Sequence, residues 1–299
     1  MKGRPGPISM PPSNLRMSLS KMLQRLSSIL TPPDPLRTAA GQPEVLIISY
    51  PKTGRTWLRM MLGKYICLKY GLDDCQILDT PVLTDHSGLP VTKFIHDGSN
   101  LRRRRSFRLL DPSKSGYREK KVLLLTRSIE DSMVSAYFQV SSRLNIFHGT
   151  VSEFLRDERY GVDKFIRFHR DWYSQQAVPQ QFDLITYEQM QTDAASVLTT
   201  TLEFIGESPV SDQSVRAAAE YCSFDNLRAV EQSQQLARPM QMTDADDPNS
   251  RKVRRGVVGG YVDDLSADDL AYIRQRTRGA DCSFVKLCPQ SQVAYSGNN

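Results

Sequence analysis

Cysteine, histidine and long apolar runs are all scarce in this chain of 299 residues, and each scarcity argues against a class of protein. The five cysteines are odd in number and contain no CxxC pair, so we expect free thiols rather than a disulfide framework. With only four histidines besides, no metal site is expected. The longest apolar runs, such as Val45–Ile48 and Val122–Leu125, fall far short of the roughly 20 residues that cross a membrane, so no transmembrane segment is expected.

Acidic residues are scarce only at the N-terminus. Residues 1–43 hold six basic side chains and a single acid, Asp34, so most of the net charge of +6 belongs to them. The remainder is nearly balanced, which argues against a nucleic-acid partner. We therefore predict a flexible basic N-terminal tail over residues 1–43, a folded domain over residues 44–299 and a cytoplasmic location. A transit peptide is the alternative interpretation of the tail.

Short apolar segments alternate with amphipathic ones from Glu44 onward. This order predicts an α/β fold, in which a single P-loop-like domain has a central, mainly parallel sheet with helices on both faces. Ligands in such folds bind at the carboxyl ends of the strands. The predicted strands are Val45–Tyr50, Val91–Ile95, Val122–Thr126 and Phe182–Tyr187. The predicted helices are Thr56–Tyr70, Ile129–Val140, Ala194–Ile205 and a last one from Ser266 to about Arg278, and the segment Phe154–Trp172 is predicted to be largely helical.

The turn after the first strand has the composition of an anion-binding loop. It reads Tyr-Pro-Lys-Thr-Gly-Arg-Thr-Trp over residues 50–57 and leads directly into a helix. Free N–H groups and the helix dipole favour an anion at a helix N-terminus. Lys52 adds a cation, Gly54 permits a close backbone approach, and the hydroxyls of Thr53 and Thr56 add donors. The loop does not match the Walker A pattern GxxxxGK[ST].

This loop resembles the 5′-phosphosulfate loop, YPKSGTTW, of the sulfotransferases that use 3′-phosphoadenosine 5′-phosphosulfate (PAPS). Arg55 stands where the family has the first of two threonines. The resemblance implies PAPS as donor cosubstrate, no metal, and Lys52 as the residue that stabilises the leaving phosphate oxygen. It implies that the 5′ side of the donor is held by Lys52, Thr53, Gly54, Arg55, Thr56 and Trp57.

Three further segments resemble the same family, in the expected order. Residues 127–135 are similar to its RDPRDVAVS stretch, residues 254–256 to its RKG element, and Tyr187 and Phe224 to aromatic residues that contact the adenine. A departure follows the RKG element, where GDWK is replaced by Gly-Gly-Tyr-Val at residues 259–262. The resemblance implies that the 3′-phosphate is bound by Arg127, Ser135, Arg254, Arg255 and Gly256.

His96 directly follows a predicted strand and occupies the position of the family's catalytic histidine. A neutral imidazole is a suitable general base for a hydroxyl near pH 7. Asp97 is the rival base, because some carbohydrate sulfotransferases use a carboxylate. The family's additional lysine, two residues before the histidine, is replaced by Phe94.

The acceptor is expected to be a small molecule such as a phenol, an alcohol or an amine, and a carbohydrate is the less favoured choice. The hint comes from four apolar side chains, Tyr137, Phe138, Phe147 and Met240, and three loops are expected to wall the acceptor pocket. Those loops are Asp73–Pro90, Gln139–Arg159 and Gln232–Val253. Two other functions remain open at this point: a P-loop-like kinase, and a nucleotide-binding protein of the sulfotransferase fold without catalysis.

Overall fold

The computed structural model describes residues 41–233 and 247–280. The chain divides into two units, residues 1–37 and 38–299, and every element below belongs to the second unit. The predicted tail, apart from residues 41–43, and Met240 lie outside the described residues. Within the described ranges, no helix is both long and apolar enough to span a membrane.

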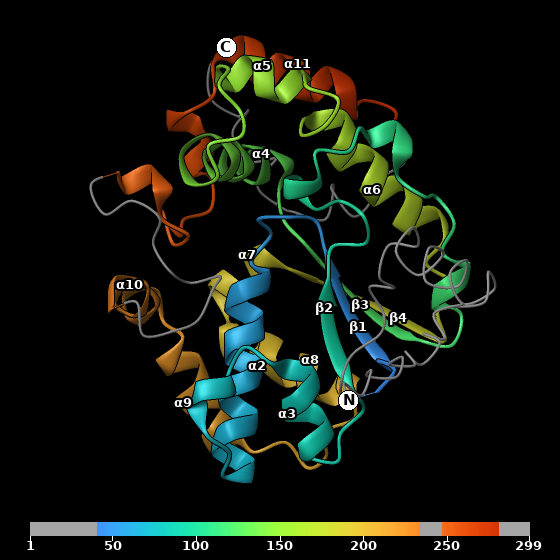
Figure 1. Ribbon diagram of the computed structural model, residues 1–299, viewed down its shortest axis with the longest axis vertical. Coiled ribbons are helices and arrows are strands. Elements are labelled where there is room, and N and C mark those ends of the chain that lie inside the picture. Colours follow the sequence, from blue (N-terminus) through green and yellow to red (C-terminus); the bar gives the residue numbers. More distant parts are fainter. Residues whose placement is uncertain (1–40, 234–246, 281–299) are drawn as a thin grey trace, which may run out of the picture. The chain divides into compact units, whose positions relative to one another are not determined.

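Four parallel strands form the sheet, in the order β2-β1-β3-β4 (Figure 1). β1 and β3, in the middle of the sheet, are apolar and buried along almost their whole length because helices cover both of their faces. The predicted parallel α/β fold is therefore confirmed. The strands are β1 (Val45–Ser49), β2 (Thr92–Ile95), β3 (Lys121–Thr126) and β4 (Gln181–Thr186).

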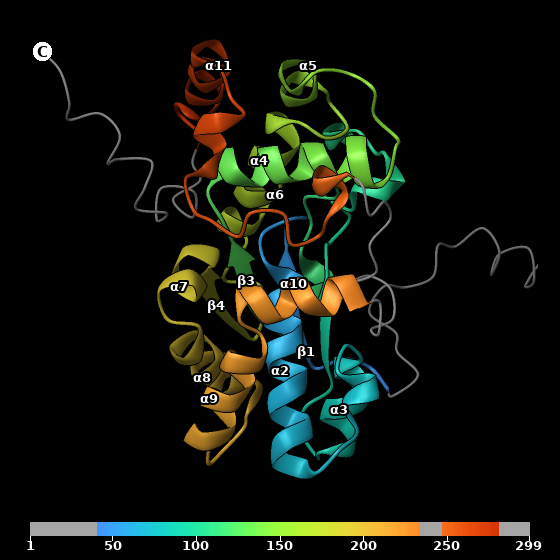
Figure 2. The ribbon, with the colours of Figure 1, turned by 90° about the vertical axis from the view of Figure 1, so that its left-hand side faces the viewer.

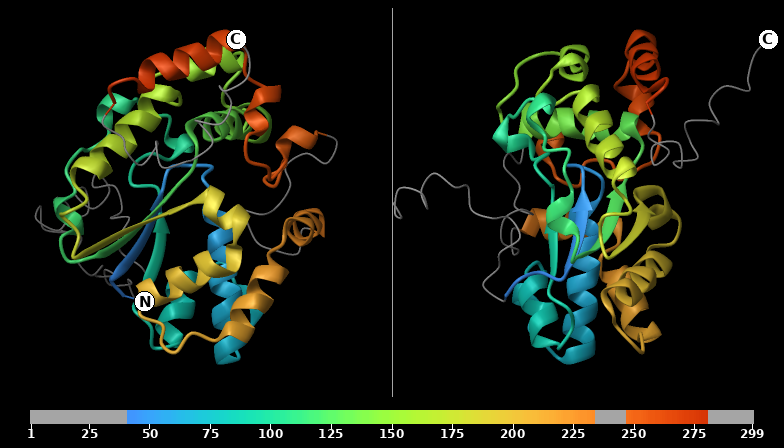
Figure 3. Two further views of the ribbon diagram at one scale, coloured as in Figure 1. Left: turned by 180° about the vertical axis from the view of Figure 1, so that it is seen from behind. Right: turned by 90° about the vertical axis from the view of Figure 1, so that its right-hand side faces the viewer.

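The helices lie on both sides of this sheet. One side carries α2, α3, α8 and α9, and the other carries α4 and α6 with α5 and α11 beyond them (Figures 1 and 3). The bounds are α2 (Arg55–Tyr70), α3 (Thr80–His86), α4 (Ile129–Phe138), α5 (Val151–Arg156), α6 (Val162–Ser174), α7 (Tyr187–Thr192), α8 (Ala194–Ile205), α9 (Asp212–Tyr221), α10 (Phe224–Ser233) and α11 (Ala267–Thr277).

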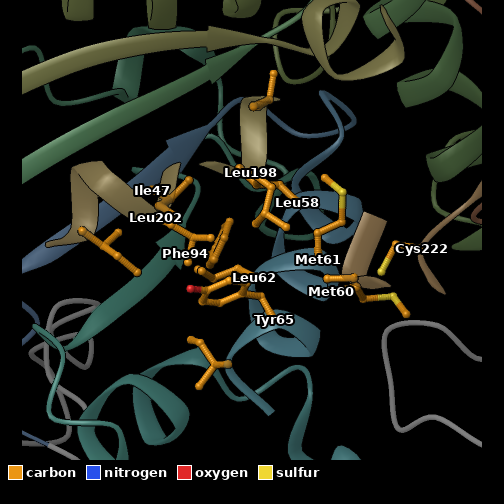
Figure 4. Packing of buried hydrophobic residues seen from close by; sticks show 14 of the residues in the cluster. Ile47, Leu58, Met60, Met61, Leu62, Tyr65, Phe94, Leu198, Leu202 and Cys222 are labelled. Atoms are coloured by element: carbon orange, nitrogen blue, oxygen red, sulfur yellow. The ribbon is translucent and has the colours of Figure 1, made fainter. Parts of the chain in front are cut away.

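The largest apolar cluster fills the space between the sheet and α2, α8 and α9 (Figure 4). Ile47 of β1 points into this cluster together with Leu62 of α2 and Leu202 of α8, all fully buried. On the opposite face, Trp172 of α6 stacks on Phe182 of β4, with ring centroids 6.2 Å apart. Alternate strand residues thus bury apolar surface on both faces, and this burial fixes the strand register.

The segment Phe154–Trp172, predicted to be largely helical, is helical over most of its length but forms two helices. α5 ends at Arg156 and α6 begins at Val162. At Gly161 the backbone passes so close to α5 that a Cβ would lie 2.3 Å from the carbonyl oxygen of Leu155. The helix predicted over Ile129–Val140 is interrupted earlier than expected, since α4 ends at Phe138 and a π-helical turn follows over Gln139–Arg143.

The two faces of α2 give a matched test of this packing. Leu62 is fully buried in the core, whereas Leu68 on the same helix is 43% exposed. We expect Leu62→Ala to lower the free energy of unfolding by roughly 2–5 kcal/mol, through lost burial and a residual cavity. Leu68→Ala should change it by less than about 0.5 kcal/mol. Urea unfolding measures both values, and equal losses would contradict the packing described.

Candidate active site

All four strand ends place a polar or aromatic residue at the carboxyl edge of the sheet. β1 runs into the loop that contains Lys52, β2 into His96, β3 into Arg127 and β4 into Tyr187. The register brings these residues together, since Thr126 pairs with Thr186 and Ile48 pairs with Ile95. As a result, the Arg127 guanidinium lies 4.1 Å from the centre of the Tyr187 ring.

The turn between β1 and α2 has two residues in the left-handed region. Gly54, the N-cap of α2, has φ 95°, and Lys52 has φ 74°, an uncommon conformation for a residue with a side chain. No side chain caps α2, and its first turn has no acid. The Thr53 hydroxyl donates instead to the carbonyl oxygens of Tyr50 and Leu125, at 2.9 and 3.3 Å. The N-terminus of α2 is therefore left open to an anion.

Among the described residues, His96 has a hydrogen-bond partner at one ring nitrogen, Nδ1. Its Nδ1 lies 2.8 Å from the carbonyl oxygen of Ser49. A carbonyl oxygen can only accept, so Nδ1 carries the proton and Nε2 keeps its lone pair. Burial, together with the charges of Arg55 and Lys252, holds the pKa of His96 well below its ordinary value. The ring is thus a neutral imidazole with a free basic nitrogen at neutral pH.

Asp97 has a different environment from its neighbour. One of its carboxylate oxygens lies 2.8 Å from Nζ of Lys114, and the other accepts a 2.5 Å hydrogen bond from the hydroxyl of Tyr117. Asp97 is not among the residues that line the cavity described below, whereas His96 is. Both of its oxygens are therefore used in holding the loop after β2.

A carboxylate of α4 holds the backbone at the end of the segment 251–261. Asp131 of α4 accepts hydrogen bonds from the backbone N–H groups of Gly259 and Tyr261, at 2.9 and 3.2 Å, and lies 3.4 Å from Arg127. Arg127 in turn donates to the carbonyl oxygen of Val257 at 3.1 Å. Gly259 and Tyr261 belong to the segment that departs from the family's GDWK, so their backbone conformation, rather than the replaced side chains, makes this connection.

Arg254 and Arg255 of the same segment are paired with acids that follow it. Arg254 lies 3.3 Å from Asp264 and over the ring of Phe138, while Arg255 lies 2.7 Å from Asp263. Gly256 has φ 67° and is packed against the ring of Phe224, since a Cβ there would come within 2.2 Å of it. Gly256 is therefore required both by its backbone conformation and by the ring beside it.

These elements enclose a cavity of about 1020 Å³, and Phe224 and Leu227 of α10 line it; Figure 2 shows α10 in front of α2. With one exception, every site residue predicted from the sequence lines it. The exception is Thr53, whose side chain points into the loop. The predicted residues that line the cavity are Lys52, Gly54, Arg55, Thr56, Trp57, His96, Arg127, Ser135, Tyr187, Phe224, Arg254, Arg255 and Gly256.

The loops expected to wall the acceptor pocket border this cavity only in part, and Tyr137, Phe138 and Phe147 do not line it. Tyr137 and Phe147 do not line the cavity but pack edge to face with each other and with Phe154. Phe138 lies under Arg254 outside the lining. The segment Asp73–Pro90 contributes no lining residue either, because much of it forms α3 beside α2. Of the three expected walls, only the described parts of the second and third border the cavity.

Four polar residues that no sequence motif singled out lie at or beside the part of the cavity that contains Lys52 and His96, which we call its reaction end. Gln139 accepts a 3.1 Å hydrogen bond from Nζ of Lys52. Arg143 and Lys252 line the cavity, and Glu231 pairs with Arg143 at 3.1 Å. Lys252 could have been noticed two residues before Arg254, but nothing in the sequence says that its side chain faces inward. Gln139 and Arg143 lie in a π-helical turn that periodicity does not predict.

Positive charge is concentrated in this cavity. Burial and the nearby charges of Arg143, Arg127 and Arg254 lower the pKa of Lys52 to about 7, against the attraction of Glu231. Burial and Arg59 lower the pKa of Arg55 to about 10. Among the described residues, no group of three or more His, Cys, Asp and Glu side chains could hold a metal. The site is therefore built to receive a molecule with several negative charges.

This fold and site define a sulfotransferase. A family model described as "Sulfotransferase domain" matches residues 42–280. The chain therefore belongs to the sulfotransferase family, which confirms the class of PAPS-dependent enzyme that the loop motifs predicted.

Two curated relatives and one solved structure illustrate the relationship. Sulfotransferase 2B1 of Homo sapiens is 26% identical over 253 residues, and the match covers 79% of this chain but just under two thirds, 66%, of the human protein. Sulfotransferase 1E1 of Bos taurus is 25% identical over 268 residues, 81% of this chain and 85% of the relative. The structure of mouse sulfotransferase SULT7A1 complexed with PAP aligns with a TM-score of 0.56 and 16% identity, over 82% of this chain and 88% of that one. The structural likeness confirms the fold.

Gly256 tests the close packing of the segment 251–261. We expect Gly256→Ala to weaken binding of PAP (adenosine 3′,5′-bisphosphate) by at least about tenfold, because the new methyl group must displace Phe224 and a positive φ is strained in alanine. Gly279→Ala is the matched control, since Gly279 also has a positive φ, 78°, but a Cβ added there would meet no atom within 4 Å. Calorimetric titration measures the PAP affinity of both variants, and an unchanged affinity of Gly256→Ala would contradict the close packing described.

A substitution of Lys52 tests whether the neighbouring positive charges lower the stability of the folded protein. Its pKa of about 7 lies below the ordinary value of 10.5, so the unfolded chain binds more protons between these pH values and stability rises with pH in that window. Lys52→Met should therefore raise the melting temperature of the ligand-free protein by ~2–4 °C at pH 6.5. The gain should shrink as the pH rises toward 9. Lys120→Met, just before β3 at the opposite edge of the sheet, serves as the control, and a lower melting temperature for Lys52→Met would contradict this account.

Proposed function

We propose that this chain transfers a sulfuryl group from PAPS to a hydroxyl or amine of a small-molecule acceptor, with His96 as the general base and Lys52 as the residue that stabilises the leaving group. The observation that carries the proposal is the presence of both residues in one cavity, at adjacent strand ends. His96 offers a free basic nitrogen, and Lys52 offers a cation above the open N-terminus of α2.

The donor would lie along the carboxyl edge of the sheet. Its 5′ end fits the uncapped N-terminus of α2, where the backbone N–H groups of Gly54, Arg55 and Thr56 and the ammonium of Lys52 are available. Thr53 would contribute its backbone only, because its hydroxyl is used inside the loop. The 3′-phosphate fits the guanidinium groups of Arg127, Arg254 and Arg255, with the hydroxyl of Ser135 and the backbone at Gly256 beside them.

Aromatic rings stand at the places where the adenine would be held. Trp57 and Tyr187 meet edge to face with ring centroids 5.8 Å apart, and both line the cavity. Phe224 lies on the α10 side of the same cavity. Such rings bury a purine by stacking and by excluding water. PAP is the ligand named for the mouse sulfotransferase whose fold this chain shares, which supports an adenine nucleotide here.

In this proposal the protein contributes positioning and charge to an in-line transfer. Nε2 of His96 takes the proton of the acceptor hydroxyl as the acceptor oxygen forms its bond to sulfur. The bond between sulfur and the 5′-phosphate oxygen breaks, and the electron pair stays on that oxygen, where Lys52 stabilises the charge. PAPS supplies the activated sulfuryl group, so the products are a sulfated acceptor and PAP. His96 then loses its proton to solvent.

His96 is preferred to Asp97 as the base for two reasons. Asp97 is outside the cavity lining and both of its oxygens are engaged, by Lys114 and Tyr117. The pKa of His96 is well below its ordinary value, so the ring is ready to accept a proton across the neutral range. The alternative of a P-loop-like kinase lacks support, because the loop after β1 has no Walker A sequence.

A replacement at each candidate base separates the two roles. We expect His96→Ala to lower kcat by at least about 10²-fold, within the contribution of general bases, while PAP binds with unchanged affinity. Asp97→Asn should keep most of the wild-type kcat, since it retains the shape of the loop. Steady-state transfer of labelled sulfate from PAPS measures the rates. Near-normal turnover of His96→Ala together with an inactive Asp97→Asn would assign the base to Asp97.

The acceptor itself is to be found by a screen with labelled PAPS over phenols, alcohols, amines and sugars. Labelled product from at least one acceptor, absent with His96→Ala, supports the proposed reaction and shows whether oxygen or nitrogen is sulfated. Tight PAP binding without transfer to any acceptor would favour a nucleotide-binding protein of this fold without catalysis.

A further inference from the structure

Lys252 is a second lysine at the reaction end of the cavity. It lines the cavity together with Lys52, Arg55 and His96, although it belongs to a segment 200 residues further along the chain than Lys52. Its side chain is partly buried, and its ammonium has no hydrogen-bond acceptor or ion-pair partner among the described residues. A cation that faces a cavity beside other cations, without an acid to neutralise it, favours an anionic ligand there.

The backbone of Lys252 is held in place by a buried carboxylate. Glu231 of α10 accepts hydrogen bonds from the N–H groups of Lys252 and Val253, at 2.5 and 2.9 Å. The same carboxylate lies 3.1 Å from Arg143, which also donates to the carbonyl oxygen of Ser250. Glu231 is only 1% exposed. Glu231 therefore connects α10, the π-helical turn at Arg143 and the segment that contains Lys252. It binds the backbone of Lys252 and leaves the ammonium beside the cavity, without a partner among the residues that the structure describes.

The charges that act on Lys252 agree with its place in the cavity lining. The charges of Lys52 and Arg55 both lower the pKa of Lys252, after burial as the largest cause, and Glu231 opposes them. The charge of Lys252 in turn lowers the pKa of His96. Lys252 is therefore within electrostatic reach of both the candidate base His96 and the leaving-group lysine Lys52.

We propose that Lys252 is a further catalytic residue, which donates N–H hydrogen bonds to the oxygens of the sulfuryl group during its transfer. The inference rests on the proposed function, since the transferred group must pass between Lys52 and His96. Lys252 keeps its own protons throughout: the sulfur–oxygen bond to PAP breaks, the bond to the acceptor forms, and the acceptor proton goes to His96. The position two residues before His96 cannot supply this cation, because it is occupied by Phe94, which is buried in the core.

Comparison of PAPS with PAP tests this role directly, because PAP lacks the sulfuryl group. We expect Lys252→Met to bind PAP within about twofold of wild type but to bind PAPS roughly 10–100-fold more weakly, as expected for the loss of a charge-assisted hydrogen bond. With the acceptor found by the screen, kcat should fall about 10²-fold, as for loss of one transition-state donor. Lys252→Arg should restore part of both losses, and Lys120→Met should change neither.

Each other outcome overturns the proposal. Equal weakening of PAP and PAPS would make Lys252 a ligand of the nucleotide phosphates. A raised acceptor KM with unchanged kcat and unchanged PAPS affinity would make it part of an anionic-acceptor subsite, and wild-type behaviour would show that it has no role. Lys252→Gln repeats the measurement if Lys252→Met lowers the melting temperature. Wild-type protein that binds neither nucleotide would refute the proposed function itself, which is a separate result.

Discussion

The common edge of a parallel sheet is the constraint on which the rest of the site depends. Because β1, β2, β3 and β4 run in the same direction, their carboxyl ends must meet at one edge, and each end delivers a different functional group. The register is fixed by apolar side chains on both faces of the sheet, far from the chemistry. The pairing of Thr126 with Thr186 sets Arg127 against Tyr187, and the pairing of Ile48 with Ile95 sets His96 against Ser49.

The second organising feature is positive charge that is only partly neutralised. Three acids, Asp131, Glu231 and Asp264, bind backbone N–H groups or arginines around the cavity, and so position its walls. They do not pair with Lys52 or Lys252, whose pKa values are both lowered by burial and by other cations. Repulsion among these cations therefore lowers the stability of the ligand-free protein, and a bound polyanion would remove that repulsion. This is the trade-off expected where binding charge must be ready before the ligand arrives.

Much of this site was predictable because strand ends are visible in a sequence. Buried apolar runs fix the four strands, and the residues that follow them, such as Lys52, His96 and Arg127, fall at the same edge in any parallel arrangement. Periodicity could not show that Gly161 splits a helix, since the reason is a close approach to the carbonyl of Leu155. Nor could it show that Lys252 points inward, because its direction is set by Glu231, 21 residues earlier in the chain.

The central claim of this account is that the carboxyl edge of the sheet binds an adenine nucleotide with phosphates at both the 3′ and the 5′ positions. Calorimetric titration of the wild-type protein with adenosine 3′,5′-bisphosphate, adenosine 5′-monophosphate and ATP tests this claim most directly. We expect tight binding of the bisphosphate and at least about 10²-fold weaker binding of the monophosphate, since the charge-assisted hydrogen bonds of Arg127 and Arg254 to the 3′-phosphate are lost. Tight binding of ATP without binding of the bisphosphate would contradict the account.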